Sequence, residues 1–186
     1  MSEPAARRAT YDERLNLPDD VVGEILDGTL HAQPRPAPRH ASAASRLGAT
    51  VSVEFDDAFD RRGGWRILDE PELHLGDDVI VSDISGWRRP RLAELPDIAW
   101  IETVPDWACE VPSPSTAGRD RVVKQAIYAR EGVSHLWFVD PNARTVEVFA
   151  LGDDRHWSLV RAVEGDDAVA LQPFDALEFP LARLWS

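Results

Sequence analysis

Apolar residues recur at spacings of three and four in two long stretches of the chain, which is the period of an amphipathic helix. One stretch covers residues 40–62 and is followed by two glycines, so we expect a long helix that ends there. The other covers 116–131 and predicts a second helix. A short helix is expected over 10–18, because Thr10 and Glu13 have the spacing of a capping box.

Short apolar or alternating runs between these helices predict β-strands. The clearest is a hairpin over 21–34, in which Asp27 and Gly28 form a two-residue turn. A second hairpin or a meander, with a turn at 76–78, is expected over 65–87 after the long helix, and further strands are expected at 107–111, 135–140, 144–151 and 156–163. This order predicts a single domain, residues 1–186, of the α/β or α+β class, with a central mixed sheet flanked by helices.

The 186 residues include 33 acids and 20 bases, which give a formal charge of −13. This charge argues against binding of nucleic acid through a broad basic surface, so contacts with phosphate have to be local or bridged by a metal ion. The sequence shows neither a signal peptide nor a membrane span. Its one cysteine, Cys109, has no partner for a disulfide, so we expect a buried thiol in a cytoplasmic protein.

Two carboxylates stand at the ends of apolar strands. In 107–111, alternation places Ala108 and Glu110 on one face and Cys109 on the other. In the segment VIVSDI, the same alternation places Asp83 at the end of an apolar row. A buried carboxylate is costly unless it is neutralised, hydrogen-bonded or bound to metal. We therefore expect Asp83 and Glu110 to bind Mg²⁺ or Mn²⁺ through oxygen ligands.

The only lysine of the chain, Lys124, lies in the second predicted helix among 19 arginines elsewhere. A lysine can exchange a proton near neutral pH where an arginine cannot. Its position beside the apolar stripe predicts partial burial at the edge of the core, with a lowered pKa. The alternative is an ordinary helix ion pair with Asp120, four residues earlier, worth about 0.3–0.5 kcal/mol.

Three segments resemble a known family when they are taken together: GEILDG, ELHLGDDVIVSDISGWRR and DWACEVPSPSTAGRDRVVKQAIYAREGVSHLWFVDP. They are similar to the Uma-two family of restriction-type endonucleases, a branch of the PD-(D/E)XK nuclease superfamily. The resemblance implies a restriction-endonuclease-like fold and a divalent-metal nuclease site. It assigns the acid of the first hairpin, the two metal-binding acids and the helix-borne lysine to Glu24, Asp83, Glu110 and Lys124.

The sequence departs from the pattern of that superfamily at three positions. Ser82 precedes Asp83 where a proline is usual, which keeps the metal ligand. Pro112 stands where orthodox members carry a lysine, so activity requires Lys124 to reach the site from its helix. Gly23 precedes Glu24 where the family tends to have an aromatic residue, which weakens the assignment of Glu24. A purely structural acid near the turn of the hairpin is the alternative there.

Further candidates concern contacts with the substrate. A basic cluster, Arg88, Arg89 and Arg91, is either a solvated loop or a phosphate-docking patch. His40 opens the long predicted helix and either caps it or contacts phosphate, with capping the favoured interpretation.

These observations predict a cytoplasmic, Mg²⁺- or Mn²⁺-dependent endonuclease that hydrolyses DNA by activation of water. One alternative is a catalytically weak or silent relative that serves as a binding or assembly module, for example as a homodimer. Another is a metal-dependent hydrolase of a different phosphoester.

Overall fold

The computed structural model describes residues 7–56, 63–113 and 116–185. Its helical segments are α1 (Tyr11–Leu15), α2 (Pro38–Phe55), α3 (Ala117–Arg119), the π-helical turn η1 (Asp120–Lys124), α4 (Gln125–Glu131) and α5 (Ala182–Trp185). Its strands are β1 (Val21–Leu26), β2 (Thr29–Pro34), β3 (Trp65–Asp69), β4 (Glu72–Leu75), β5 (Asp78–Val81), β6 (Ile84–Arg88), β7 (Trp107–Glu110), β8 (His135–Asp140), β9 (Thr145–Leu151), β10 (Trp157–Glu164), β11 (Ala168–Ala170) and β12 (Glu178–Pro180). None of the helices in these ranges is long and apolar enough to cross a membrane.

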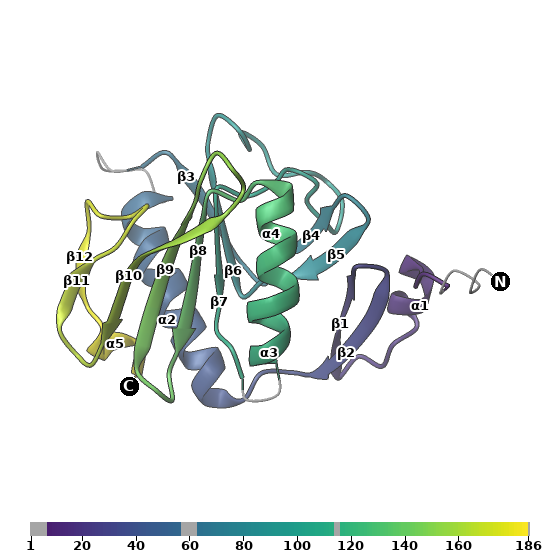
Figure 1. Ribbon diagram of the computed structural model, residues 1–186, viewed down its shortest axis with the longest axis horizontal. Coiled ribbons are helices and arrows are strands. Elements are labelled where there is room, and N and C mark those ends of the chain that lie inside the picture. Colours follow the sequence, from purple (N-terminus) through teal and green to yellow (C-terminus); the bar gives the residue numbers. More distant parts are fainter. Residues whose placement is uncertain (1–6, 57–62, 114–115, 186) are drawn as a thin grey trace.

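A six-stranded sheet with the order β10-β9-β8-β7-β6-β3 forms the centre of the molecule (Figure 1). Its strands pair antiparallel except for β7 and β8, which are parallel and are connected through α3, η1 and α4. Such a crossover is the usual connection between parallel neighbours. The predicted mixed sheet with flanking helices is therefore confirmed.

The two faces of this sheet are covered by different helices (Figure 1). The apolar side of α2 packs with Trp107 and Cys109 of β7 on one face. Ile127 and Tyr128 of α4 pack with Ala108 of the same strand on the other face. The alternation predicted for this strand is thus correct, and Cys109 is the buried free thiol that was expected.

A second sheet, with the order β2-β1-β5-β4, lies beside the first. It contains the predicted hairpin with its turn at Asp27 and Gly28, both in the left-handed region. Of the two alternatives for 65–87, the second hairpin is confirmed, because β4 and β5 pair antiparallel. A continuous meander is wrong, because β3 and β6 belong to the central sheet. The chain changes sheets at Ser82 and Asp83, so Asp83 lies at a corner and not in one continuous apolar row. The buried Ser82 hydroxyl pairs with that of Ser85 at 2.6 Å, which satisfies a polar group at this corner.

The helices agree with their predicted positions but not in every detail. Thr10 and Glu13 form the predicted capping box of α1. The long helix begins at Pro38, a favoured first position, and its predicted end over 57–62 lies outside the described residues. The second predicted helix is divided by the wide turn η1, and Gly132 ends it in the left-handed conformation.

Candidate functional site

Glu110 ends the central strand β7 on the face covered by α4, and its side chain is only 2% exposed. Its two oxygens have separate partners: Tyr128 donates its hydroxyl to Oε1 at 2.5 Å, and Lys124 donates Nζ to Oε2 at 3.0 Å. Burial raises the pKa of Glu110 well above its usual value, although Lys124 acts in the opposite direction. Both carboxylate oxygens of Glu110 are therefore held by side chains of the helical connection.

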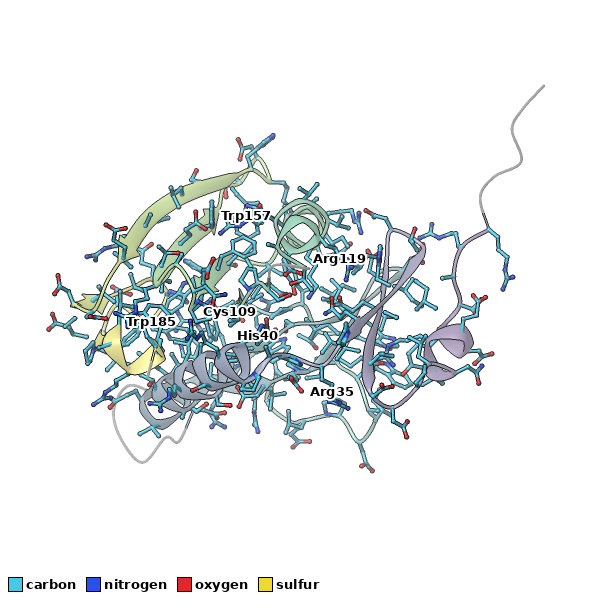
Figure 2. All side chains as sticks on the ribbon, turned by 90° about the horizontal axis from the view of Figure 1, so that it is seen from below. Arg35, His40, Cys109, Arg119, Trp157 and Trp185 are labelled. Atoms are coloured by element: carbon cyan, nitrogen blue, oxygen red, sulfur yellow. The ribbon has the colours of Figure 1, made fainter. Side chains whose placement is uncertain are left out.

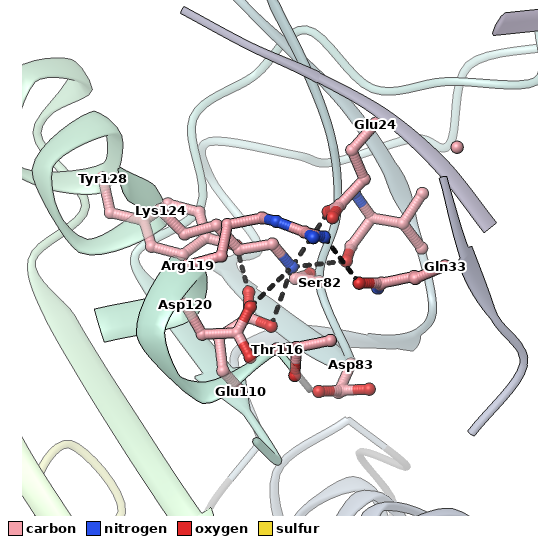
Figure 3. A network of polar contacts seen from close by, with 12 residues as sticks. Glu24, Gln33, Ser82, Asp83, Glu110, Thr116, Arg119, Asp120, Lys124 and Tyr128 are labelled. Atoms are coloured by element: carbon pink, nitrogen blue, oxygen red, sulfur yellow. Dashed lines mark hydrogen bonds and ion pairs between the residues drawn. The ribbon is translucent and has the colours of Figure 1, made fainter. Parts of the chain in front are cut away.

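Lys124 lies at the centre of the polar network drawn in Figure 3. Its Nζ atom is 2.9 Å from Oε1 of Glu24 and 3.0 Å from Oε2 of Glu110, and it donates to the carbonyl of Val81 at 3.1 Å. Asp120, the helix partner considered from sequence, is more distant at 3.9 Å. Through these contacts, Lys124 connects its helix to both the hairpin sheet and the central sheet.

The predicted environment of Lys124 is wrong in two respects. The side chain is fully buried at 2% exposure and does not lie at the solvent edge. Burial lowers its pKa, but the carboxylates of Glu110, Glu24 and Asp120 outweigh burial and raise the pKa well above the ordinary value. The surrounding carboxylates thus favour the ammonium form of Lys124, which donates hydrogen bonds to them.

Glu24 enters this network from the middle of β1, where its side chain is completely buried. Its Oε1 accepts from the backbone N–H of Val81 at 3.0 Å as well as contacting Lys124. Its Oε2 is buried without a hydrogen-bond partner. Glu24 is therefore a buried acid that ties the hairpin to β5 and to Lys124.

Asp83 adjoins Glu110 at the corner between the two sheets. Its Oδ2 accepts from the backbone N–H of Val111, the residue after Glu110, at 2.7 Å. Its Oδ1 pairs with Nε2 of His40 at 2.7 Å. The capping interpretation of His40 is wrong, because the helix begins two residues earlier at Pro38 and His40 instead binds an acid of the site.

A pocket of about 320 Å³ opens between the hairpin, the start of α2 and the α3–η1 segment. Its polar lining includes most of the residues described above: Asp83, Glu110, Asp120, Lys124 and His40. Burial raises the pKa of Asp120, while Lys124 and a hydrogen bond from Thr116 lower it. Four carboxylates, counting Glu24, thus surround one ammonium group, an excess of negative charge that favours a cation.

The donor set determines which cation would fit. Within residues 7–56, 63–113 and 116–185, no group of three or more His, Cys, Asp or Glu side chains forms a ready-made metal cage. Mg²⁺ usually binds through one or two carboxylates and keeps several waters, so Asp83 and Glu110 suffice as protein ligands. The unpartnered Oε2 of Glu24 adds a further oxygen close by. The residues present therefore fit a hydrated Mg²⁺ or Mn²⁺ ion.

The predicted basic cluster lies away from this pocket. Arg88 ends β6 opposite to Asp83 and stacks on Trp65, with its guanidinium carbon 4.1 Å from the ring centroid. Arg89 and Arg91 form ion pairs at 2.6 Å with Asp56 and Asp106. The structure thus does not bring these arginines together with the carboxylates, and acids already neutralise two of them.

Several residues near the site were not expected from sequence. Arg35 lines the pocket from the connection between β2 and α2. Arg119 donates to Oε1 of Gln33 at 2.7 Å, which links α3 to the hairpin. Tyr128 lies eight residues after Asp120, and its hydrogen bond to Glu110 was not expected from sequence. A tyrosine on the helix face that bears Lys124 was the one available signal for such a contact.

Comparisons with known proteins identify a family and a similar fold. The sequence model of the Uma2 family, described as putative restriction endonuclease, matches residues 9–182. A crystal structure described as a putative nuclease belonging to DUF820, from Anabaena variabilis ATCC 29413, superposes with a TM-score of 0.73 and 22% identity. It covers 95% of this chain and 97% of that chain, and at this identity the likeness shows the fold. No match was found among curated proteins.

Proposed function

We propose that this chain, which belongs to the Uma2 family of putative restriction endonucleases, hydrolyses phosphodiester bonds of DNA with Mg²⁺ or Mn²⁺. One observation carries the proposal: Lys124 lines one pocket together with Asp83 and Glu110, and it bridges Glu110 to Glu24 behind the pocket wall. These four side chains come from four separate elements or corners of the chain. Their convergence supplies the acids and the ammonium group that metal-dependent hydrolysis of a phosphodiester requires.

Asp83 and Glu110 would hold the cation. A divalent cation bound there would neutralise charge at the phosphoryl group and would lower the pKa of a bound water to near neutrality. His40 and the Val111 N–H fix the Asp83 carboxylate in one orientation, and Tyr128 does the same for Glu110. These contacts preorganise the two acids before substrate arrives.

Lys124 would stabilise negative charge on the transferring phosphoryl group. Its raised pKa favours the ammonium form, which suits Lys124 to stabilising charge rather than to accepting the proton of water. To donate a hydrogen bond to substrate, Nζ has to release one of its three acceptors. The Val81 carbonyl is the neutral one of these acceptors and is the least costly to release.

The test is nicking of supercoiled plasmid in the presence of Mg²⁺, Mn²⁺ or a chelator, paired with calorimetric titration of Mn²⁺. We expect cation-dependent nicking that Asp83→Asn abolishes together with metal binding. Asp77→Asn is the matched control, because it neutralises an exposed acid of the β4–β5 turn, 79% exposed. Equal Mn²⁺ binding by the native chain and Asp83→Asn would refute the assignment of the metal site.

A second candidate is a nuclease-fold module that binds without cleaving. The observation in its favour is that Nζ of Lys124 already donates to Val81 and Glu110 and forms an ion pair with Glu24. The same titration separates the two: metal binding without nicking of plasmid, and without hydrolysis of a small phosphodiester, favours the binding module. Hydrolysis of the small ester alone favours a phosphoesterase with a different substrate.

A further inference from the structure

Arg119, the last residue of α3, differs from the next arginine of the helical crossover in having a neutral partner. It donates Nη1 to Oε1 of Gln33 at 2.7 Å, and within the described ranges it forms no ion pair with a carboxylate. Arg121, two residues later, does form an ion pair, with Glu147. A guanidinium has five N–H donors, so most of those of Arg119 meet no acceptor in the part of the chain that the structure describes.

The Arg119 guanidinium lies at the edge of the proposed site. Thr116 and Asp120, which flank α3 in the chain, both line the pocket. Gln33, the acceptor of Nη1, lines it from β2. Figure 2 shows Arg119 between the helical crossover and the hairpin, and Figure 3 shows its hydrogen bond to Gln33 in the same network as Lys124. Nη1 is therefore one hydrogen bond away from the lining of the pocket.

The charge of Arg119 extends over the hairpin. On β2, burial and then the Arg119 guanidinium lower the pKa of His31, while Glu24 raises it. Lys124 is held differently, because its Nζ is 2.9 and 3.0 Å from two buried carboxylates. Arg119 thus offers an incoming anion a positive charge that no described carboxylate pairs with.

The proposed nuclease function supplies the anion, which is a phosphate of DNA. A guanidinium and a phosphate form two parallel hydrogen bonds between opposite charges, whereas the amide of Gln33 offers one neutral acceptor. Exchange of the amide for a phosphate is therefore favourable. In a chain with a net charge of −13, contacts with phosphate depend on local cations of this kind.

From these contacts we propose that Arg119 binds a phosphate of the DNA next to the one that reacts, and that Gln33 holds the guanidinium in place until the substrate arrives. The proposal rests on the proposed nuclease function. Arg119 is a binding residue in this scheme, because it contacts the substrate strand and none of the buried acids. The alternative is a structural tie, in which the hydrogen bond only fastens α3 to the hairpin.

The first test is fluorescence anisotropy of a labelled DNA duplex with Ca²⁺, a cation that takes oxygen ligands. Arg119→Gln should weaken binding about tenfold, because one charge-assisted hydrogen bond is lost. The slope of log K against log salt concentration should also become less steep, by about 0.9. Arg121→Gln is the matched control, since it removes the same charge from an arginine that Glu147 already neutralises, and it should change neither quantity. Equal effects of the two variants would overturn the role of Arg119.

Gln33→Ala distinguishes phosphate binding from the structural tie. Under the proposal this variant frees the guanidinium from a competing acceptor, so DNA should bind as tightly as to the native chain or up to about tenfold more tightly. A structural tie requires the opposite result, because loss of either partner then loosens the pocket. Binding by Gln33→Ala that is weaker than that of the native chain would overturn the proposal.

Nicking of plasmid with Mn²⁺ separates this role from the nuclease function itself. We expect Arg119→Gln to raise KM about tenfold with kcat unchanged, since it removes binding that ground state and transition state share. If the native chain nicks plasmid and Arg119→Gln has the KM of Arg121→Gln, the role of Arg119 fails and the nuclease function stands. If the native chain binds DNA but does not nick it, the nuclease function fails, and the anisotropy decides whether Arg119 binds phosphate.

Discussion

His40 and Asp83 are 43 residues apart in the chain, yet Nε2 of the imidazole lies 2.7 Å from Oδ1 of the carboxylate. The first turn of α2 thereby orients an acid at the corner between two sheets. A contact of this kind typically changes metal affinity or activity by about 10- to 100-fold when it is removed.

His40→Ala should therefore weaken Mn²⁺ binding and nicking within that range. His74→Ala is the matched control, because His74 pairs with Glu72 at 2.8 Å in a comparable half-buried setting away from the pocket. Calorimetry and plasmid nicking give the two readouts. Equal effects of both variants would mean that His40 contributes to folding alone.

Tyr128 holds Glu110 through a buried hydrogen bond of 2.5 Å. Tyr128→Phe should lower the free energy of unfolding by about 1.5–3 kcal/mol, because a buried acceptor loses its donor. It should also reduce nicking. Tyr11→Phe removes a hydroxyl bonded to Glu72 at 2.7 Å and should affect stability but not nicking. Urea unfolding of each variant, compared with its nicking rate, checks this separation.

Removal of Lys124 should destabilise the fold strongly. Lys124→Met leaves the buried carboxylates of Glu24 and Glu110 without their shared cation, a change that costs about 3–5 kcal/mol in buried ion pairs. Adding Glu24→Gln to the same chain should recover part of this loss, since one uncompensated charge disappears. A double-mutant cycle by urea unfolding measures the coupling. Additive effects of the two substitutions would contradict the bridging role of Lys124.

His135 on β8 should make stability fall at mildly acidic pH. Burial lowers its pKa, a hydrogen bond with Asp106 opposes this, and Arg88 lowers it further. The unfolded imidazole takes up a proton as pH falls through about 6.5, while the folded one resists until its lower pKa. Folding is therefore penalised progressively below 6.5, and the penalty levels off once pH is below the folded pKa.

The measurement is urea unfolding of the native chain and His135→Gln between pH 5 and 8. The difference in stability between the two should shift in favour of the variant as pH falls. A difference that stays constant across this range would show that His135 titrates alike in both states.

Local patterns in the sequence predicted much of the fold and of the site. Alternation along β7 correctly placed Glu110 opposite to Cys109, and the capping box and the Asp27-Gly28 turn formed as expected. The roles of Glu24, Asp83, Glu110 and Lys124 remain predictions, although the structure brings the four side chains together.

The errors came from relationships that no local pattern records. The change of sheet at Asp83 depends on which distant strands pair with β5 and β6. The burial of Lys124 depends on a hairpin about 100 residues earlier, whose Glu24 reverses the expected direction of its pKa. Likewise, Arg89 and Arg91 form ion pairs with Asp56 and Asp106. These acids lie on other segments of the chain, and no local pattern predicted that those segments would be neighbours. The predicted homodimer remains a prediction.

The π-helical turn η1 sets the rotational phase between the two halves of the crossover connection. A π-turn takes in one residue more than an α-turn, a residue that would otherwise rotate everything on one side of it by about 100° around the helix axis. The turn thus lets the chain carry an extra residue ahead of α4 while Lys124 stays on the face that meets Glu110.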